Sequence, residues 1–550
     1  MTGQKDSGTV DDADKTPAVS TGLVQARNWR RRLLLRGLVF SFAAGGLALP
    51  AAISGSALAE PAVTGLLTIP DRKSLLDVDP VRLPPLAVAF MAGYRTPGDG
   101  GGGLMIWLPQ STEVPDDVLV FRSAVVVQGR WVRLWSGGRI SPEMAGAVGD
   151  GKANDLPAFQ RLVSASRIRG AFTIELTAGR HYYFADTLDM SVGAPGLTLE
   201  GPSAAVDVPD RGTGHLTARV ELEPTRGATV KLGDSQAVRN LQVWRHGLAT
   251  GPESLAEVRA EVARWFSEDG ERKPRTIGLW APFTDVTIEG VALIGFHTGI
   301  LVSGGRYKIR HCLIDTAGHA VEASNSKDTS LIEDVQARGL WSFRTPGTDA
   351  LGEQGYRPGT AFYIHDSSDG LQLNSVMSIA WVNGIWLHGS PEANDWMISV
   401  FQPNVETPAN DGRPTVAIRT TGDVRRITII DPRIIFGGNG NGASAGLDFG
   451  HSDPNPGAAA NNNVTVIGGA IEVANRQGIA ILARAGSNGS VSETTLAGQG
   501  LNPLVKVLAN SGRWEFHHLQ LRGPLGSGWL FVDPNAVPMV TVDGQLPPAQ

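Results

Sequence analysis

The chain has 550 residues, 68 of them glycine, and a formal net charge of −6. Residues 1–59 hold seven basic and four acidic side chains, so the remainder carries −9. An acidic remainder without a run of Lys or Arg argues against nucleic acid as a partner. The single cysteine, Cys312, excludes an internal disulfide, a cysteine zinc site and a cysteine-pair redox function.

Residues 1–59 contain the three parts of an export signal. Basic residues at 30–36 precede an apolar run from Leu38 to Ile53, and a small-x-small site closes the segment at Ala57-Leu58-Ala59. The apolar run is about 16 residues long and contains Pro50, so we expect no stable membrane anchor. The string R-R-L-L-L-R at 31–36 resembles the twin-arginine motif, which implies that the twin-arginine translocase exports the folded protein to the periplasm or beyond. An ordinary signal for an unfolded chain is the alternative.

Residues 60–138 are predicted to form a small β-rich domain. Val118–Phe121 and Ala124–Val127 read as strands, and the run Trp131–Trp135 closes the region. The glycine run at 98–103 is not followed by Lys-Ser or Lys-Thr, so it does not indicate a phosphate-binding loop.

The segment 146–201 predicts how the main body begins. The string G-A-V-G-D-G-K-A-N-D at 146–155 leads into a helix that Asp155 can cap, with Pro157 in its first turn. Phe159, Leu162 and Val163 give this helix one apolar face. The strings F-T-I-E-L, A-G-R-H-Y and L-T-L-E-G follow at 172–176, 178–182 and 197–201.

This series closely resembles the opening of the pectate-lyase superfamily. In that family the short helix plugs the first turn of a right-handed parallel β-helix. The glycine run at 98–103 and the string G-R-W-V at 129–132 also resemble N-terminal parts of related polysaccharide-depolymerising proteins, including phage tailspikes. The resemblance implies the fold and a polysaccharide partner, and it leaves the reaction open.

Internal repetition supports a solenoid independently of the resemblance. Ile288 and Ile309 are 21 residues apart and Phe362 and Ile385 are 23 apart, spacings that mark stacked repeats. Apolar-x-apolar runs recur at 300–302, 362–364, 385–387, 416–418, 447–449 and 479–481, with second runs at 286–288, 427–429 and 464–466.

We therefore predict an all-β protein, a right-handed parallel β-helix with a small N-terminal β-rich region and a short capping helix. The predicted boundaries are 1–59 for the export signal, 60–138 for the β-rich domain, 139–500 for the β-helix and 501–550 for the last coils and cap. A helical insertion around Glu253–Phe266 is expected to project from one coil. Related β-helices often form trimers, and the sequence leaves the oligomeric state open.

Two predicted coils align residue for residue, F-Y-I-H-D-S-S-D at 362–369 with I-W-L-H-G-S-P-E at 385–392. Strand alternation then points one set of side chains into the core and the other outward. The inward set is Phe362, Ile364, Ile385 and Leu387, and the outward set is Tyr363, His365, Trp386 and His388, with Arg419 of the next run extending it. Flat aromatic side chains in an exposed row suit the apolar faces of sugar rings.

The same alignment stacks Asp369 on Glu392, with Asp366 and Asp395 nearby. A glycosidase needs two carboxyls, about 5–5.5 Å apart for retention or about 6.5–9.5 Å apart for inversion. These four residues are the predicted catalytic carboxyls, and the alternative is that they hydrogen-bond their own turn backbone. Weaker candidates are Asp315, Glu322, Glu333 and Asp334 as acids, and Arg338, Arg344 and Arg357 as ligands of an acidic sugar.

The sequence motifs leave more than one reaction open. The polygalacturonase and alginate-epimerase signatures are absent, and no carboxylates have calcium-loop spacing, so no metal or cofactor is predicted. The leading hypothesis is a glycoside hydrolase acting within a bacterial exopolysaccharide or cell-surface glycan. The first alternative is a polysaccharide lyase whose base is Tyr363, His365, His388 or Lys327. The second is a non-catalytic factor for glycan binding or exopolysaccharide assembly.

Overall fold

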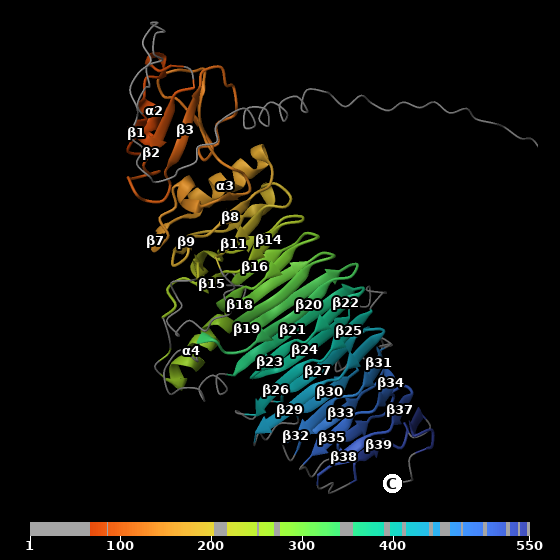
Figure 1. Ribbon diagram of the computed structural model, residues 1–550. Helices are drawn as coiled ribbons and strands as arrows, with labels where there is room; N and C mark the ends of the chain where they lie inside the picture. Colours follow the sequence, from red (N-terminus) through yellow and green to blue (C-terminus); the bar gives the residue numbers. More distant parts are fainter. Residues whose placement is uncertain are drawn as a thin grey trace, which may run out of the picture. The chain divides into compact units, whose positions relative to one another are not determined.

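In the computed structural model (Figure 1), residues 66–546 are described except 85, 203–216, 250–251, 253, 269–274, 342–355, 390–396, 410–413, 439–443, 451–461, 475–476, 499–502, 524–527 and 537–538. The predicted export signal lies outside the described residues. No helix in the described ranges is long and apolar enough to cross a membrane.

A five-stranded sheet precedes the solenoid, in the strand order β1-β2-β3-β5-β4. Its elements are β1 (Leu67–Ile69), α2 (Arg72–Asp77), β2 (Val88–Met91), β3 (Gly103–Leu108), β4 (Val120–Arg122) and β5 (Arg130–Arg133). Trp107 and Trp131 pack in its core with ring centroids 5.4 Å apart. The prediction of a strand over Ala124–Val127 was wrong, because the Ser123 hydroxyl accepts hydrogen bonds from two following N–H groups and holds a turn there.

The capping helix α3 (Leu156–Arg169) forms where the sequence predicted it and buries Phe159, Leu162 and Val163. Asp155 precedes the helix, but its carboxylate does not cap it. The two carboxylate oxygens instead accept hydrogen bonds from the N–H groups of Val148 and Gly149, at 2.6 and 3.0 Å. The predicted role was therefore wrong in detail, because the buried Asp155 fixes the glycine-containing turn that leads into the helix. Burial raises the pKa of Asp155.

The remaining strands form one right-handed parallel β-helix whose coils follow the chain order from α3 to the C-terminal strands (Figure 1). It starts with β6 (Arg139–Ile140) and β7 (Asp150–Asn154). Its first face contains β10 (Leu188–Asp189), β13 (Val230–Lys231), β16 (Ile277–Ala281), β18 (Ala292–Ser303), β19 (Lys308–Ser326), β21 (Arg357–Ser368), β24 (Trp381–Gly389), β27 (Val416–Gly422), β30 (Ala445–Phe449), β33 (Ile479–Ala483), β36 (Val505–Val507) and β39 (Leu530–Val532).

The second face contains β8 (Thr173–Glu175), β11 (Thr198–Glu200), β14 (Ala237–Arg239), β17 (Thr287–Glu289), β20 (Leu331–Ala337), β22 (Leu371–Asn374), β25 (Ile398–Phe401), β28 (Ile427–Ile430), β31 (Asn462–Ile467), β34 (Ser487–Ser492), β37 (Trp514–His517) and β40 (Val540–Val542). The third contains β9 (His181–Phe184), β12 (Arg219–Leu222), β15 (Gln242–Arg245), β23 (Met377–Ile379), β26 (Asn404–Ala409), β29 (Arg433–Gly438), β32 (Ala470–Val473), β35 (Thr495–Gly498) and β38 (Gln520–Arg522). The long strands turn corners: β18 and β20 each serve two faces, and β19 serves all three.

The core consists of apolar side chains stacked in register from coil to coil. On the first face, Val321, Phe362, Ile385, Ile418, Leu447, Ile481 and Val505 are consecutive partners. All seven are fully buried, so the column confirms the predicted repeats. The spacing of Ile288 and Ile309 is also confirmed, since these residues are direct partners on the second face.

Two corners of the coil are tight turns that contain left-handed residues other than glycine. Before the second face, Asp285, Arg306, Asp328 and Arg426 have φ between 55° and 58°. After it, His311, Asp334, Ser375, Gln402 and Asp431 are left-handed as well. A repeated turn conformation keeps the strands of successive coils in register.

Helix α4 (Leu255–Phe266) confirms the predicted helical insertion, and the hydroxyl of Ser254 caps it by accepting from the N–H of Glu257 at 3.2 Å. It does not project from its coil as expected. Its apolar face, with Val258, Val262 and Trp265, packs on side chains of β15, β18 and β19, because those strands present Trp244, Ala292, Ile294, Leu313 and Ala317 outward.

Candidate functional site

One column of side chains runs along the outside of the first face and carries most of the predicted site. Glu322, Tyr363, Trp386, Arg419 and Asp448 are consecutive register partners on β19, β21, β24, β27 and β30. The predicted alternation is confirmed, since Phe362, Ile364, Ile385 and Leu387 are fully buried and the outward residues are partly exposed. A second outward column of partners contains Ser324, His365, His388 and Thr421.

Aromatic and imidazole rings along these columns form a continuous array, made of His297, His319, Tyr363, His365, Trp386 and His388. Tyr363 stacks on His319 at 5.0 Å between ring centroids and on His365 at 4.8 Å. Trp386 continues the array, 5.3 Å from Tyr363. At the opposite end, Phe266 of α4 stacks on His297 at 5.9 Å. We call these six residues the ring array.

Glu322 is the acidic centre beside the ring array and is only 6% exposed. Arg275 donates to both of its oxygens, one of them at 3.3 Å, and the same guanidinium donates to the Thr298 hydroxyl at 2.8 Å. The Nε2 atom of His365 lies 3.3 Å from the carboxylate. The charge of Arg275 therefore balances that of Glu322, while one carboxylate oxygen remains in contact with His365.

Asp366 lies on the other side of the same imidazole. Its Oδ2 is 2.7 Å from Nδ1 of His365, so the His365 ring connects the two carboxylates. The backbone of Asp366 is left-handed, with φ of 60°, at a bulge where the register of β19 and β21 shifts. Aspartate tolerates this conformation better than most residues. The bulge turns the carboxylate back toward the ring that precedes it, and 43% of the side chain stays exposed.

Two titratable members of the ring array are held in their neutral forms. Burial, together with the neighbouring His297 and Arg275, lowers the pKa of His319 well below 6.5. Burial and the charge of Asp366 raise the pKa of Tyr363 above its usual 10. At neutral pH the stacked pair is therefore an uncharged imidazole on a protonated phenol, a flat surface without net charge.

Beyond Trp386 the surface becomes polar and positively charged. The hydroxyl of Thr421 accepts from Nε1 of Trp386 at 2.7 Å and lies 2.8 Å from Nδ1 of His388, which fixes both rings. The guanidinium of Arg419 lies over the Trp386 ring at 5.7 Å. Arg419 and Arg484 both donate to Asp448, at 3.4 and 2.6 Å.

Of the four predicted catalytic carboxyls, Asp366 and Asp369 lie among the described residues. Asp366 lies in the site, and Asp369 is an exposed turn residue whose N–H donates to the Ser326 carbonyl at 2.8 Å. Glu392 and Asp395, and the predicted ligand Arg344, lie outside the described residues. The pairing of Asp369 with Glu392 therefore stays a prediction.

The prediction that Arg357 binds an acidic sugar was wrong. The guanidinium is fully buried and pairs with the equally buried Asp315, with Nε and Nη2 at 3.1 and 2.5 Å from one carboxylate oxygen. The other oxygen accepts from the N–H groups of Leu340 and Trp341. Both candidates are therefore structural and hold the start of β21, the strand that carries Tyr363 and His365.

The sequence ranked Glu322 as a weak candidate and did not find Arg275, His297 or His319. Glu322 is the direct register partner of Tyr363, but 41 residues separate them, almost twice the period seen elsewhere. The signal that could have shown this is the run A-V-E-A at 320–323, which has the same inward-outward pattern as the coils that follow. No cluster of three or more metal-ligating side chains was found among the described residues.

Comparisons with known proteins give matches only among solved structures, since no family model and no curated protein matches the chain. The A-module of the Azotobacter vinelandii mannuronan C-5 epimerase AlgE6 is 14% identical, with a TM-score of 0.48 over 74% of this chain and 100% of that one. The tailspike gp49 of Acinetobacter baumannii bacteriophage Fri1, a capsular polysaccharide depolymerase, is 13% identical, with a TM-score of 0.39 over 86% and 76%. WceF of Pantoea stewartii, a glycan biofilm modifying enzyme with a tailspike-like parallel β-helix fold, is 13% identical, with a TM-score of 0.34 over 84% and 47%.

Proposed function

We propose that the protein is an exported polysaccharide-degrading enzyme, secreted or periplasmic, that binds a glycan along the ring array. We further propose that it is a glycoside hydrolase that cleaves the chain beside Glu322 and Asp366. The observation that carries the proposal is the position of these carboxylates, one at each nitrogen of His365, directly beside Tyr363 and Trp386. The rings of Tyr363, His365, Trp386 and His388 are partly exposed. Their arrangement next to paired carboxylates suits a sugar chain better than it suits a protein interior.

In the proposed reaction Glu322 removes a proton from water as the water oxygen attacks the anomeric carbon. The glycosidic bond breaks, and the hydrogen-bonded pair of His365 and Asp366 supplies a proton to the departing oxygen, so that each product ends in a hydroxyl. His365 also touches Glu322, so the proton that Glu322 took from water can return to this pair, which resets the site. Because an imidazole ring lies between the two carboxyls, they are farther apart than the close pair that retention requires, so we expect inversion at the anomeric carbon.

The test uses the full chain and a panel of neutral and uronate-containing polysaccharides, with two readings, new reducing ends and ultraviolet absorbance of unsaturated products. Glu322→Gln and Asp366→Asn should each lower the rate of reducing-end formation about 10²- to 10⁴-fold, the range of a lost general acid or base. The matched control is Glu333→Gln, since Glu333 also pairs with an arginine, Arg310 at 3.1 Å, but its strand β20 carries it on the second face.

Two results would contradict this assignment. Full activity in Glu322→Gln would remove Glu322 from the mechanism. Loss of activity in Asp369→Asn and Glu392→Gln, with Asp366→Asn active, would move the chemistry to the pair predicted from the sequence. Binding without cleavage on every substrate would indicate a glycan-binding or assembly factor.

One observation favours a polysaccharide lyase as the second candidate. The neutral His319 and the protonated Tyr363 are stacked, and neutral imidazole and phenol groups are a base and an acid suited to β-elimination next to a uronate carboxylate. A lyase would produce ultraviolet absorbance together with each new reducing end, and Tyr363→Phe would abolish both readings. A hydrolase would produce reducing ends without absorbance.

A further inference from the structure

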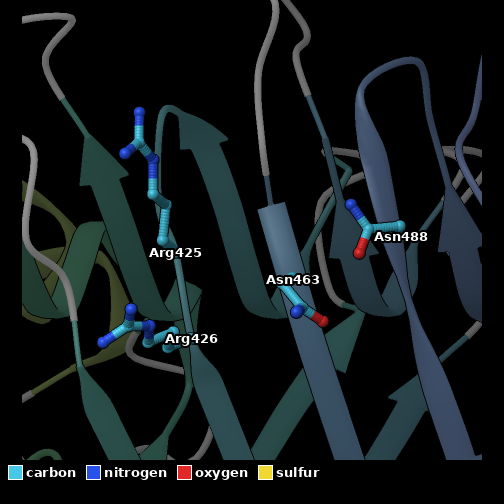
Figure 2. Close-up of a pocket in the computed structure, with 4 residues that line it drawn as sticks. All are labelled: Arg425, Arg426, Asn463 and Asn488. Atoms are coloured by element: carbon cyan, nitrogen blue, oxygen red, sulfur yellow. The ribbon is translucent and has the colours of Figure 1, made fainter.

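A pocket of about 340 Å³ opens at the corner between the first and second faces, several coils beyond Glu322. It is lined by Arg425, Arg426, Asn463 and Asn488 (Figure 2). Asn463 and Asn488 are direct register partners on β31 and β34. Arg426 precedes Ile427, which pairs with Val464, so Arg426 occupies the same position one coil earlier. The pocket is therefore a column of an arginine and two amides on three successive coils.

Among the described residues, the two arginines of the pocket differ in their ion pairs. Arg425 is held by Asp423, which accepts from its Nε and Nη2 at 3.1 and 2.7 Å. Within the described ranges, Arg426 has no carboxylate within ion-pair distance, and its side chain is exposed. The contrast is Arg306, which has the same left-handed turn conformation at the same corner, with φ of 57° against 55°. Arg306 is neutralised by Asp285 and Asp328, at 2.7 and 3.2 Å.

The corner follows directly from the surface that carries Trp386. Thr421, which fixes the Trp386 and His388 rings, lies near the end of β27, five residues before Arg426. Arg419 on β27 and Arg484, directly after β33, lie on the coils before and after that of β30, and they share its carboxylate, Asp448. Along the chain direction the outer surface thus changes from aromatic and imidazole rings to guanidinium and amide groups.

We propose that the corner pocket binds the carboxylate of an acidic sugar residue in the same polysaccharide that lies on the ring array. The Arg426 guanidinium supplies the charge and a planar pair of donors that match a carboxylate. The amides of Asn463 and Asn488 can donate to the second oxygen or to ring hydroxyls. This inference rests on the proposed function, which identifies the ligand as a polysaccharide. The pocket adds that this polysaccharide contains uronate residues.

The experiment measures binding of the full chain to oligomers of galacturonate, glucuronate, mannuronate and guluronate, and to the carboxyl-reduced form of each. Isothermal titration calorimetry at two salt concentrations gives the Kd. We expect at least one acidic oligomer to bind about tenfold more tightly than its reduced form, with the difference shrinking as salt screens the contact. Arg426→Gln should remove most of that difference, and Asn463→Ala part of it.

The matched control is Arg306→Gln, which removes an arginine from the same turn position and should leave the acidic preference intact. Equal affinity for acidic and reduced oligomers in all four pairs would overturn the inference, as would an unchanged preference in Arg426→Gln. The experiment distinguishes a failure of the pocket assignment from a failure of the proposed function. Cleavage of neutral chains without an acidic preference would refute only the pocket, whereas acidic binding that needs Arg426, without cleavage of any polymer, would refute only the enzyme.

Discussion

The buried ion pair of Asp315 and Arg357 allows a stability prediction that tests the architecture beneath the site. Arg357→Met keeps an unbranched side chain of similar length but removes the guanidinium. Asp315 would then remain in the interior with two backbone N–H donors, from Leu340 and Trp341, and no opposite charge. Removing one partner of a fully buried pair costs about 3–5 kcal/mol, because the remaining charge is uncompensated.

The double variant Asp315→Asn/Arg357→Met should recover a large part of this loss. The amide oxygen of asparagine can still accept from the N–H groups of Leu340 and Trp341, and no buried charge remains. A double-mutant cycle with Asp315→Asn alone then gives the coupling energy of the pair, which we expect to exceed about 2 kcal/mol.

Equilibrium unfolding in urea, followed by tryptophan fluorescence and by circular dichroism, measures these free energies of unfolding. At about 2.1 cal/mol/K per residue, the roughly 400 residues that the structure describes give about 0.85 kcal/mol/K, so Arg357→Met should lower the Tm by about 4–6 °C. A loss below about 1 kcal/mol, or a double variant no more stable than Arg357→Met, would refute the reasoning. Either result would mean that water reaches the carboxylate.

Three further predictions concern residues near the same strands. Burial raises the pKa of Cys312 to about 12. The thiol should therefore not react with a disulfide reagent at pH 8 until denaturant unfolds the chain. Rapid labelling of the native protein would contradict the burial of Cys312. The pKa of His319 in the folded protein is well below 6.5. As the pH drops below 6.5, His319 is protonated in the unfolded chain while it stays neutral in the folded protein. The free energy of unfolding should therefore fall as the pH drops from 6.5 toward the folded pKa. His319→Asn should flatten this part of the pH dependence of the free energy of unfolding, and an unchanged slope would show that other groups cause it. A Cβ at Gly359 would lie 1.9 Å from the Gly318 carbonyl oxygen. Gly359→Ala should therefore destabilise the protein by about 1–3 kcal/mol or more in the same urea assay. An unchanged free energy of unfolding would show that the backbones of β19 and β21 do not approach each other this closely.

The sequence by itself determined the fold, because the solenoid is a local pattern repeated many times. Inward residues such as Phe362 and Ile385 recur once in each coil within the same apolar-x-apolar pattern, and parallel stacking places each on its predecessor. The capping helix and its apolar face were predictable for the same reason, since a 3.6-residue period is visible within one segment. The outward positions of Tyr363, His365, Trp386 and His388 followed from alternation alone.

Only the tertiary structure decided which charged groups meet. Asp315 and Arg357 looked like candidate ligands, and their burial depends on how β19 and β21 pack across a 42-residue gap. Arg275 reaches Glu322 from a different coil, at a separation of 47 residues that no short-range pattern encodes. The side-chain rotamers of Asp366 and His365 depend on a bulge whose register shift is a property of two paired strands. Which charged groups pair is thus decided by the tertiary structure. The burial of an apolar residue in a repeated strand pattern can already be predicted from the sequence.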